Sequence, residues 1–467
     1  TGILQMLVTF SAFVTGCIIA ALLIPLLFLI PVSQDKRVLI FRRFIRAVVF
    51  IPVRLSPTVR IFFDNRHRED FSKPAVIIAN HQSFIDILML LSLHPQIIMM
   101  TNKWVWNSPF FGHIVRFAGF LYHKDGVESH ISEISGMREK GYSLLIFPEG
   151  TRSADMEIHR FHKGAFKIAE ELEMDILPVV IYGNGNLVSK SQPFYVKHGV
   201  IGCRILKRIE HSDTSFGTGY RERTKRISEY VRREYSSLRS EYDTPSNRFF
   251  YHSVLANYLY KGPVLEWYMR IKMNMERSYE QFQNIIPYNA NVTDIGCGYG
   301  PLAFMLSALS PARTVTGIDY DQKKTELASA SYAAGRNLRF LCEDALMTEL
   351  SESDVFIMND ILHYLLPHEQ ELLIRKCVQK LKTGGFVIIR DGDAERTKSH
   401  RMTRLSEWFS ITLLGFNKAS HAPCFIGKSK MEGIALSLNC TIDTKENDKV
   451  TSNTIYIIKP LETNDKV

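Results

Sequence analysis

The hydrophobic and polar positions of this chain begin with a charge-free apolar run from Ile3 to Val32. Because an α-helix rises about 1.5 Å per residue, roughly 20 apolar residues are enough to cross the hydrocarbon core of a membrane. The pattern predicts a transmembrane helix within residues 1–34. The basic residues follow this run rather than precede it, which argues against a cleaved signal peptide.

A mixed pattern follows over residues 35–70. Between Asp35 and Arg68, nine Lys or Arg residues accompany only two acidic residues, and apolar residues recur among them at irregular helical spacing. Such a cluster after an apolar run is typical of a basic belt at a membrane surface. We expect residues 38–63 to form a helix along the membrane face, with a solvated helix as the alternative. The positive-inside rule then places the chain after Lys36 on the cytoplasmic side of the inner (cytoplasmic) membrane.

From Ala75 onward, short apolar strands alternate with helical stretches in two series. The predicted strands are 75–79, 144–147 and 176–182 in the first series, and 292–295, 314–319, 338–342, 355–358 and 386–390 in the second. This alternation predicts two domains of the α/β class. A charged run over residues 220–242 ends in turn-forming residues from Asp243 to Asn247, which mark a break. The predicted domains are therefore 71–243 and 244–467.

Composition supports this division and limits the function classes. A chain of 467 residues exceeds what one hydrophobic core usually organises, and 46% hydrophobic with 22% charged residues excludes a disordered chain. The net charge of +9 could indicate a nucleic acid, an anionic membrane or an acidic substrate. Because the excess lies beside the apolar run, we expect membrane lipids and no nucleic acid as partners. The seven cysteines have no metal-type spacing, so no metal is expected.

The first candidate site follows the strand at 75–79 and reads Asn80-His-Gln-Ser-Phe-Ile-Asp86. His81 is predicted at the C-terminal edge of a sheet, where α/β proteins place their chemistry, and Asp86 about one turn into the next helix. A carboxylate on one imidazole nitrogen stabilises the imidazolium, so the other nitrogen can accept a hydroxyl proton. His81 and Asp86 can supply this pair, although a capped helix start would show the same two residues.

A second block, Pro148-Glu149-Gly150-Thr151-Arg152-Ser153, follows the strand at 144–147. A turn at Gly150 would free backbone amides beside Thr151 and Arg152, which predicts an anion site of phosphate size.

Taken together, the two blocks resemble the NHxxxxD and FPEGTRS motifs of the glycerolipid acyltransferase family, which includes 1-acylglycerol-3-phosphate acyltransferases. The resemblance covers roughly residues 75–185. It implies that His81 is the general base and Asp86 its orienting partner, and that acyl-CoA or acyl carrier protein is the acyl donor. It assigns four residues to the phosphate of the acceptor: Glu149, Gly150, Thr151 and Arg152.

One position departs from that family. Where its members have an Arg near the end of a Gly-led strand, this chain reads Gly119-Phe-Leu-Tyr-His-Lys124-Asp125. Lys124 is the candidate replacement cation, but an ammonium cannot reproduce the bidentate grip of a guanidinium. The acceptor is therefore either lysophospholipid-like or another lipid or polyketide-like alcohol.

The second candidate site is a glycine loop between a predicted strand and a helix. It reads Asp294-Ile-Gly296-Cys-Gly298-Tyr-Gly300. Such a loop lets backbone amides approach a nucleotide. Its third glycine comes one place earlier than in the dinucleotide fingerprint, which argues against NAD. The next strand ends at Asp319, within reach of ribose hydroxyls, and the third leads to Asp344, suited to an adenine amino group.

This series resembles the class I S-adenosylmethionine (SAM)-dependent methyltransferases over roughly residues 285–395. The resemblance implies a Rossmann-like, seven-stranded domain with SAM as its cofactor. It assigns Asp294 and the three glycines to the methionine part, Asp319 to the ribose and Asp344 to the adenine. Asp321 competes for the ribose role.

The fourth predicted strand leads to Asn359 and His363, which the same resemblance places near the transferred methyl group. His363 is either a base for the methyl acceptor or a structural residue.

The sequence thus predicts a membrane-bound, bifunctional enzyme of lipid biosynthesis that transfers an acyl group and a methyl group. Its domain order also resembles composite exporter, acyltransferase and methyltransferase proteins of bacteria, and Thr1 in place of Met suggests a longer parent chain. Two alternatives stay open for the second domain. It could bind SAM without turnover, or it could methylate RNA, which would require a basic second half.

Overall fold

The structure is a computed structural model that describes residues 2–54, 58–101, 103–109, 111–122, 130–153, 155–188, 197–276, 278–335, 337–395, 422–446 and 453–461. These residues form two compact units, one of residues 1–243 with 247–249 and the other of residues 244–246 with 250–467.

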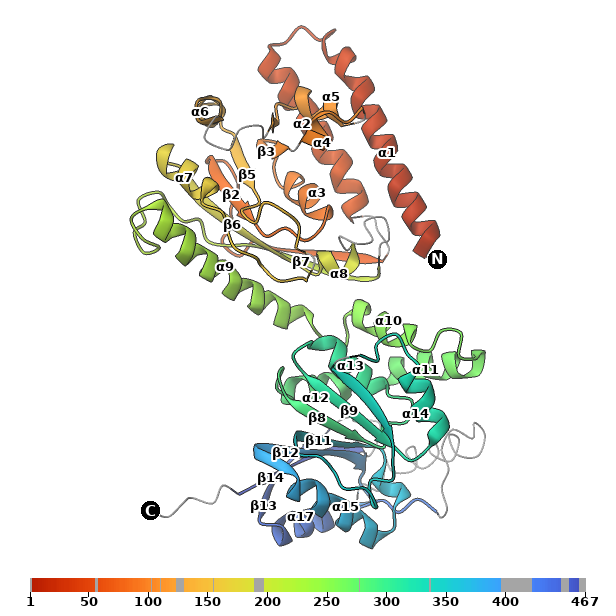
Figure 1. Cartoon of the computed structure of the whole chain (residues 1–467). Coiled ribbons are helices and arrows are strands. Elements are labelled where there is room, and N and C mark those ends of the chain that lie inside the picture. The colour runs from red at the N-terminus through yellow and green to blue at the C-terminus, as the bar shows by residue number, and fades with distance from the viewer. Residues whose placement is uncertain are drawn as a thin grey trace. The chain divides into compact units, whose positions relative to one another are not determined.

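A seven-stranded sheet organises the N-terminal unit (Figure 1). In spatial order its strands are β1 (Val59–Asp64), β7 (Gly199–Ile205), β6 (Asp175–Tyr182), β2 (Ala75–Ala79), β5 (Ser143–Ile146), β3 (Ile97–Thr101) and β4 (Leu121–Tyr122). All neighbouring pairs are parallel except β6 and β7, which are antiparallel. The predicted α/β class is confirmed for this unit.

Both faces of this sheet are covered, because successive side chains of a strand point to opposite faces. Val76 and Ile78 of β2 join a core with α6 (Ile131–Glu139), α7 (Gly164–Glu171) and α9 (Tyr220–Tyr242). Ala75, Ile77 and Ala79 join a second core with α2 (Gln34–Arg54) and α3 (Ile85–Leu91). The central strand β2 is therefore buried along its whole length.

Helix α1 (Gly2–Leu27) packs beside α2 and α5 (Gly112–Phe117). Ala20 and Leu27 of α1 are buried in an apolar cluster with Phe41 and Ile114. The transmembrane helix expected within residues 1–34 is not found, since no helix in the described ranges is long and apolar enough to cross a bilayer. Part of the apolar surface of α1 packs against these neighbouring helices.

The expected helix over residues 38–63 is also corrected. Helix α2 ends at Arg54, and residues 59–64 form the edge strand β1, which pairs with β7. The basic belt is partly internal as well, because Arg42 is buried and donates to the Ala118 carbonyl at the end of α5. Its guanidinium lies 4.4 Å from the centre of the Tyr142 ring. Burial lowers the pKa of Arg42 to about 10.

The C-terminal unit contains a second seven-stranded sheet, as predicted. Its strands in spatial order are β10 (Leu338–Cys342), β9 (Thr314–Asp319), β8 (Asn291–Ile295), β11 (Ser353–Asn359), β12 (Leu381–Gly392), β14 (Asn453–Pro460) and β13 (Cys440–Glu446). Strands β8, β9, β10, β11 and β12 are parallel to their neighbours, while β14 pairs antiparallel with both β12 and β13. The carboxyl ends of β8 to β11 thus share one edge (Figure 1).

Helices surround this second sheet (Figure 1). They are α10 (Arg248–Ala256), α11 (Pro263–Met275), α12 (Ser278–Ile285), α13 (Pro301–Leu309), α14 (Gln322–Ser329), α15 (Pro367–Gln379) and α17 (Lys428–Ser437), with a short 3-10 helix η2 (Leu362–Tyr364) after β11.

Candidate functional sites

The loop after β2 is fastened to the neighbouring strand β6. The Asn80 side-chain amide donates to the Ile181 carbonyl at 2.8 Å and accepts from the Ile181 N–H at 2.8 Å. Asn80 therefore continues the ladder where the β2 backbone leaves the sheet. This fixes the start of the segment that carries His81.

His81 and Asp86 are brought together, as the sequence predicted. Asp86 is the second residue of α3 rather than one turn into it, and its side chain is fully buried. Its Oδ2 lies 3.0 Å from His81 Nδ1 and accepts the N–H groups of Gln82 and Ser83 at 2.8 and 2.9 Å. An ionised carboxylate can only accept, so the proton of neutral His81 belongs on Nδ1 and Nε2 can accept another.

The His81 ring is held in place from a second side. It stacks on Phe147 with ring centroids 4.1 Å apart, and its side chain is 13% exposed. The imidazole is thus oriented yet still reachable by a substrate hydroxyl. This arrangement can perform general base catalysis.

Glu149 is buried and its carboxylate binds backbone rather than solvent. One oxygen accepts the His81 N–H at 2.8 Å and the other accepts the His159 N–H at 2.9 Å. Burial raises the pKa of Glu149, and these hydrogen bonds counteract that rise. The contacts that the structure shows give Glu149 a bracing role between two loops. Its assignment to the acceptor phosphate stays a prediction.

The rest of the predicted anion site is partly engaged. Gly150, at φ +71°, donates its N–H to the Phe147 carbonyl, and Ser153 donates to the His81 carbonyl at 2.8 Å. Thr151 is exposed and Arg152 is half-buried at the same turn. Lys124 lies outside the described residues.

His81 lines an apolar cavity of about 630 Å³. Near the histidine it is lined by Phe147, Gly150 and His162, and it continues between α1, α2, α3 and α5. Its lining is mostly hydrophobic, so it can hold a hydrocarbon chain with one end close to His81 Nε2. The motif blocks gave no sign of this cavity, because α1 and α2 were interpreted as membrane elements.

Sequence reasoning also missed two partners of the His81 loop. Asn184, in the short helix α8 (Asn184–Leu187), donates its side-chain amide to Asp86 Oδ1. Tyr235 of α9 accepts from the Gln82 side chain at 2.6 Å. Both residues lie more than 90 positions after the histidine, and neither belongs to a recognisable motif.

In the C-terminal unit, the glycine loop has the backbone that its sequence suggested. Gly296, Gly298 and Gly300 all have positive φ, at +69°, +57° and +78°. A Cβ at Gly296 would collide with Ile361, whereas one at Gly298 would meet nothing within 4 Å. The loop therefore leaves room for a ligand to approach its backbone, so it fits the nucleoside cofactor that the sequence implied.

The carboxylates predicted for the ribose and adenine lie at the same edge. Asp319 accepts the Gly298 N–H at 2.8 Å and the Asp321 N–H at 2.9 Å, so it is already oriented beside the loop. Asp321 caps α14 through Lys323 and does not line the cavity. Asp344 is exposed and lines the cavity.

Asp294 lies beneath the loop and does not line the cavity. Its pKa is raised from 3.8 to about 7, chiefly by burial; the charge of Lys272 opposes this rise and that of Asp319 adds to it. A buried carboxylate that titrates near neutral pH is poised to respond to a cationic ligand.

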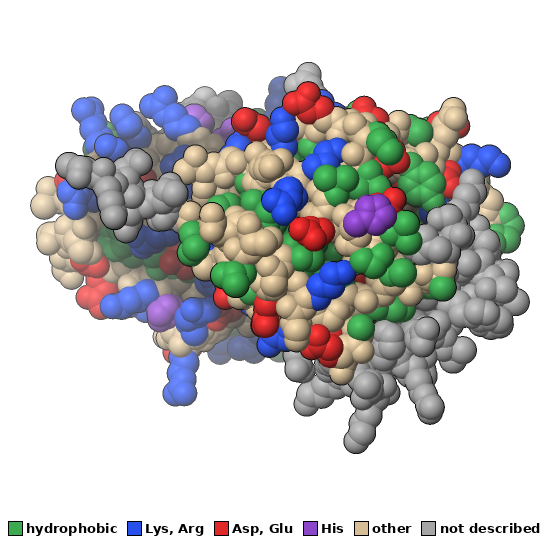
Figure 2. Space-filling model, turned by 90° about the horizontal axis from the view of Figure 1, so that it is seen from below, with side chains coloured by type: hydrophobic (Ala, Val, Ile, Leu, Met, Phe, Trp, Pro, Cys, Tyr) green, Lys and Arg blue, Asp and Glu red, His purple; other side chains and the backbone are tan. Residues whose placement is uncertain are grey.

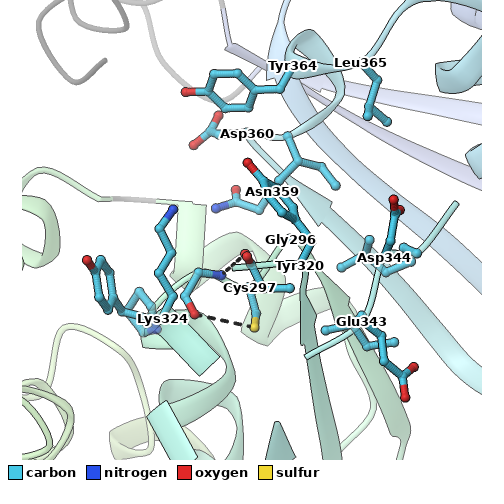
Figure 3. A pocket seen from close by; sticks show the side chains of 18 of the residues that line it. Gly296, Cys297, Tyr320, Lys324, Glu343, Asp344, Asn359, Asp360, Tyr364 and Leu365 are labelled. Carbon is cyan, nitrogen blue, oxygen red and sulfur yellow. Dashed lines mark hydrogen bonds between the residues drawn. The ribbon is translucent and has the colours of Figure 1, made fainter. Parts of the chain in front are cut away.

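Figure 3 shows the cavity over this edge, with Lys324, Asn359 and Asp344 approaching from three different elements. Helix α11 adds Tyr268 and Lys272 to the lining of the cavity. Burial lowers the pKa of Lys324, and the nearby carboxylates oppose that shift.

His363 does not line this cavity, although its neighbour Tyr364 does. Its Nδ1 lies 2.7 Å from Asp391 Oδ1, and both side chains are buried. The ring also stacks on Phe425, with centroids 4.9 Å apart. These contacts favour the structural interpretation of His363 over the catalytic base.

In the described ranges no group of His, Cys, Asp and Glu side chains could hold a metal ion. Both sites therefore consist of side chains and backbone, without a metal-ligand cluster among these residues.

Two family models match the chain, one described as Acyltransferase over residues 60–182 and one described as Methyltransferase domain over residues 292–385. A 1-acyl-sn-glycerol-3-phosphate acyltransferase of Helicobacter pylori is 30% identical over 169 residues, which cover 35% of this chain and 70% of that protein. The chain spans only 50% to 59% of the length of three other acyltransferases that it matches, from Arabidopsis thaliana, Brassica napus and Caenorhabditis elegans.

Two solved structures are also similar. The 1-acyl-sn-glycerophosphate acyltransferase PlsC of Thermotoga maritima has 22% identity and a TM-score of 0.44, covering 51% of this chain and 95% of that one. Human N-acetylserotonin methyltransferase in complex with SAM has 16% identity and a TM-score of 0.35, covering 44% of this chain and 57% of that one.

Proposed function

Because this chain belongs to the 1-acyl-sn-glycerol-3-phosphate acyltransferase family and also contains a class I SAM-dependent methyltransferase domain, we propose that it is a bifunctional enzyme of lipid biosynthesis. Its N-terminal unit esterifies an alcohol with an acyl group from acyl-CoA or acyl carrier protein. Its C-terminal unit methylates a related intermediate. The observation that carries the first part is the His81–Asp86 pair, whose histidine lines an apolar cavity.

The geometry supports a direct transfer. His81 Nε2 accepts the proton of the acceptor hydroxyl as its oxygen bonds to the thioester carbonyl carbon. The carbon–sulfur bond then breaks, and the leaving thiolate takes the proton from the imidazolium. Asp86 stabilises that imidazolium through Nδ1 at 3.0 Å. Arg152 would provide a positive charge for an acceptor phosphate, and Lys124, which lies outside the described residues, is a further candidate.

The cavity supports the choice of a long acyl donor. A hydrocarbon chain inside it would be removed from water, at about 0.8 kcal/mol per buried CH₂. The thioester at the end of such a chain would then lie beside His81, because His81 lines the cavity that holds the chain.

We further propose that α1 and α2 attach the enzyme to the cytoplasmic face of the inner membrane. At the turn between them, Phe28 and Leu29 are exposed, the latter by 79%, and Lys36 and Arg43 are exposed nearby. Apolar side chains beside basic ones are typical of segments that insert into a lipid surface. Co-sedimentation with phosphatidylglycerol vesicles should weaken in Leu29→Glu, and unchanged binding would contradict this attachment.

For the C-terminal unit, the cavity at the edge of β8 to β11 is the site for SAM, which supplies an electrophilic methyl group when bound. Asp319 would accept from the ribose hydroxyls and Asp344 from the adenine amino group, while Asp294, buried beneath the loop, would stabilise the methionine ammonium through its charge. Asn359 lies on the same cavity and would help to align the acceptor.

Charge argues against RNA as the acceptor. Residues 244–467 contain 26 Lys and Arg against 25 Asp and Glu, so nearly all of the net charge of +9 belongs to the first half. The face drawn in Figure 2 has acidic and basic side chains interspersed rather than a basic band. Nucleic-acid binding depends on such a band.

The test uses the full chain, palmitoyl-CoA and 1-oleoylglycerol 3-phosphate, with CoA release and product lipids measured. His81→Ala should abolish acyl transfer without changing the unfolding temperature, whereas the exposed His67→Ala should leave the rate unchanged. Activity retained in His81→Ala would remove His81 as the base.

The methyl transfer is tested in the same preparation with methyl-labelled SAM and a lipid extract. Asp319→Ala should lose SAM binding and methylated lipid while acyl transfer continues. If the wild-type protein binds SAM but forms no methylated lipid, the alternative of a domain that binds SAM without turnover would be favoured.

A further inference from the structure

The carboxylate of Asp86 has a partner on each oxygen, although the motif that contains it accounts for only one. Oδ2 accepts from His81 and from the N–H groups of Gln82 and Ser83, which all belong to the same loop. Oδ1 accepts from the side-chain amide of Asn184, which arrives from the far end of β6. Asn184 is itself fully buried.

The orientation of this amide follows from chemistry. A carboxylate has no proton to donate, so only the Nδ2 end of Asn184 can face it favourably. Among the described residues, Asn184 Oδ1 has no hydrogen-bond partner. The amide is therefore placed for Asp86 and for no other described group.

Two glycines flank Asn184 in a closely packed turn. Gly183 has φ +88°, and a Cβ there would collide with the Val200 carbonyl of β7. A Cβ at Gly185 would collide with the Met156 side chain and lie 3.3 Å from Cβ of Gln82 in the His81 loop. The turn after β6 is thus packed against β7 on one side of the asparagine and against Met156 and the His81 loop on the other, which leaves room only for small residues at both positions.

We propose that Asn184 is a positioning residue for acyl transfer, acting through Asp86. Its amide completes the set of donors that holds a fully buried carboxylate aimed at His81 Nδ1. Without it, one oxygen would be buried with no described donor, which costs free energy and loosens the carboxylate. The inference rests on the proposed acyltransferase activity. It also extends the catalytic apparatus beyond residues 60–182, where the family match ends.

A double-mutant cycle tests the inference in the full chain, with palmitoyl-CoA and 1-oleoylglycerol 3-phosphate as probes. Asn184→Ala should lower kcat about tenfold to hundredfold and leave both KM values within about twofold. In an Asp86→Ala background the same change should have little further effect on kcat, because its target is gone. Asn184→Asp should be worse than Asn184→Ala, since it sets a second carboxylate against Asp86. Asn186→Ala, on the same short helix but only half-buried, should match the wild type.

A second readout needs no substrate. Carbethoxylation of His81 by diethyl pyrocarbonate, followed by mass spectrometry of the His81 peptide, reports how nucleophilic Nε2 is. The rate should fall severalfold in Asn184→Ala, whereas in an Asp86→Ala background the Asn184→Ala change should lower it no further. Equal rates in wild type and Asn184→Ala would overturn the inference, as would additive effects on kcat in the cycle. If the wild type releases no CoA, the proposed acyl transfer fails, while the labelling rates still decide the role of Asn184.

Discussion

The pH dependence of SAM binding should reveal whether the charge of Asp294 stabilises the methionine ammonium. Burial raises the pKa of Asp294 from 3.8 to about 7 in the free protein, so its carboxylate is mostly protonated at pH 6 and mostly ionised at pH 8. A cationic ammonium favours the ionised form. SAM binding should therefore strengthen as pH rises through about 7. Below pH 7, binding should release a proton from Asp294.

The size of the effect follows from that pKa. If the carboxylate is fully ionised in the complex, the apparent affinity should rise about tenfold between pH 6 and pH 8, which is roughly 1.4 kcal/mol. Asp294→Asn cannot titrate and should lack this rise. The amino group of SAM also titrates in this range, so the informative quantity is the affinity of the wild type divided by that of Asp294→Asn.

Titration calorimetry in two buffers of different ionisation enthalpy measures both the affinity and the released proton. A ratio that stays constant from pH 6 to pH 8 would refute a charge interaction between Asp294 and the ammonium. Asp294 should also make the stability of the SAM-free protein depend on pH, but here stability falls as pH rises. Because the folded pKa lies above the unfolded value, the stabilisation is complete below about pH 4 and lost as pH rises through about 7, with roughly 4 kcal/mol as an upper bound.

Two further substitutions test the loops. Glu149→Gln replaces one buried carboxylate oxygen by an NH₂ group that would face the N–H of His81 or His159. We expect thermal unfolding to show a stability loss of about 1–3 kcal/mol and CoA release to show a lower kcat. A change confined to the acceptor KM would support phosphate binding instead. Gly300→Ala sets a Cβ against the Phe340 ring at φ +78°, so we expect the free energy of unfolding to fall by about 1–3 kcal/mol and SAM binding to weaken. As a control, Gly433→Ala places its Cβ in open space on α17 and should leave stability unchanged or raise it.

The strands that were predicted well are short and rich in apolar and β-branched residues. The predicted bounds of β2, β9 and β10 agree with the structure, because turn residues or charges end each apolar run abruptly. Strand β1 was missed since its Val59–Asp64 sequence is half exposed and its strand conformation depends on pairing with β7. Likewise, apolar composition alone could not reveal that α1 packs against α2 and α5.

The same contrast separates the site residues. His81 and Asp86 lie five positions apart, so their pairing at 3.0 Å could be inferred from one sequence block. Asn184 reaches the same carboxylate across 98 positions and depends on the fold of β6. Glu149 shows a different limit, because its position in the block was clear while its two backbone partners were not.

The methyltransferase site depends still more on tertiary structure, because methyl transfer needs alignment more than acids and bases. Asp360 follows Asn359 at the end of β11 and has φ +58°, a conformation that costs a residue with a Cβ about 1–2 kcal/mol. Arg390, at the end of the neighbouring strand, forms an ion pair with Asp360 and also faces Glu276, 3.6 Å away, at the end of α11. This buried arginine therefore offsets the backbone strain at Asp360, next to Asn359 in the lining of the cavity, and it ties that turn to the end of α11, whose Tyr268 and Lys272 also line the cavity.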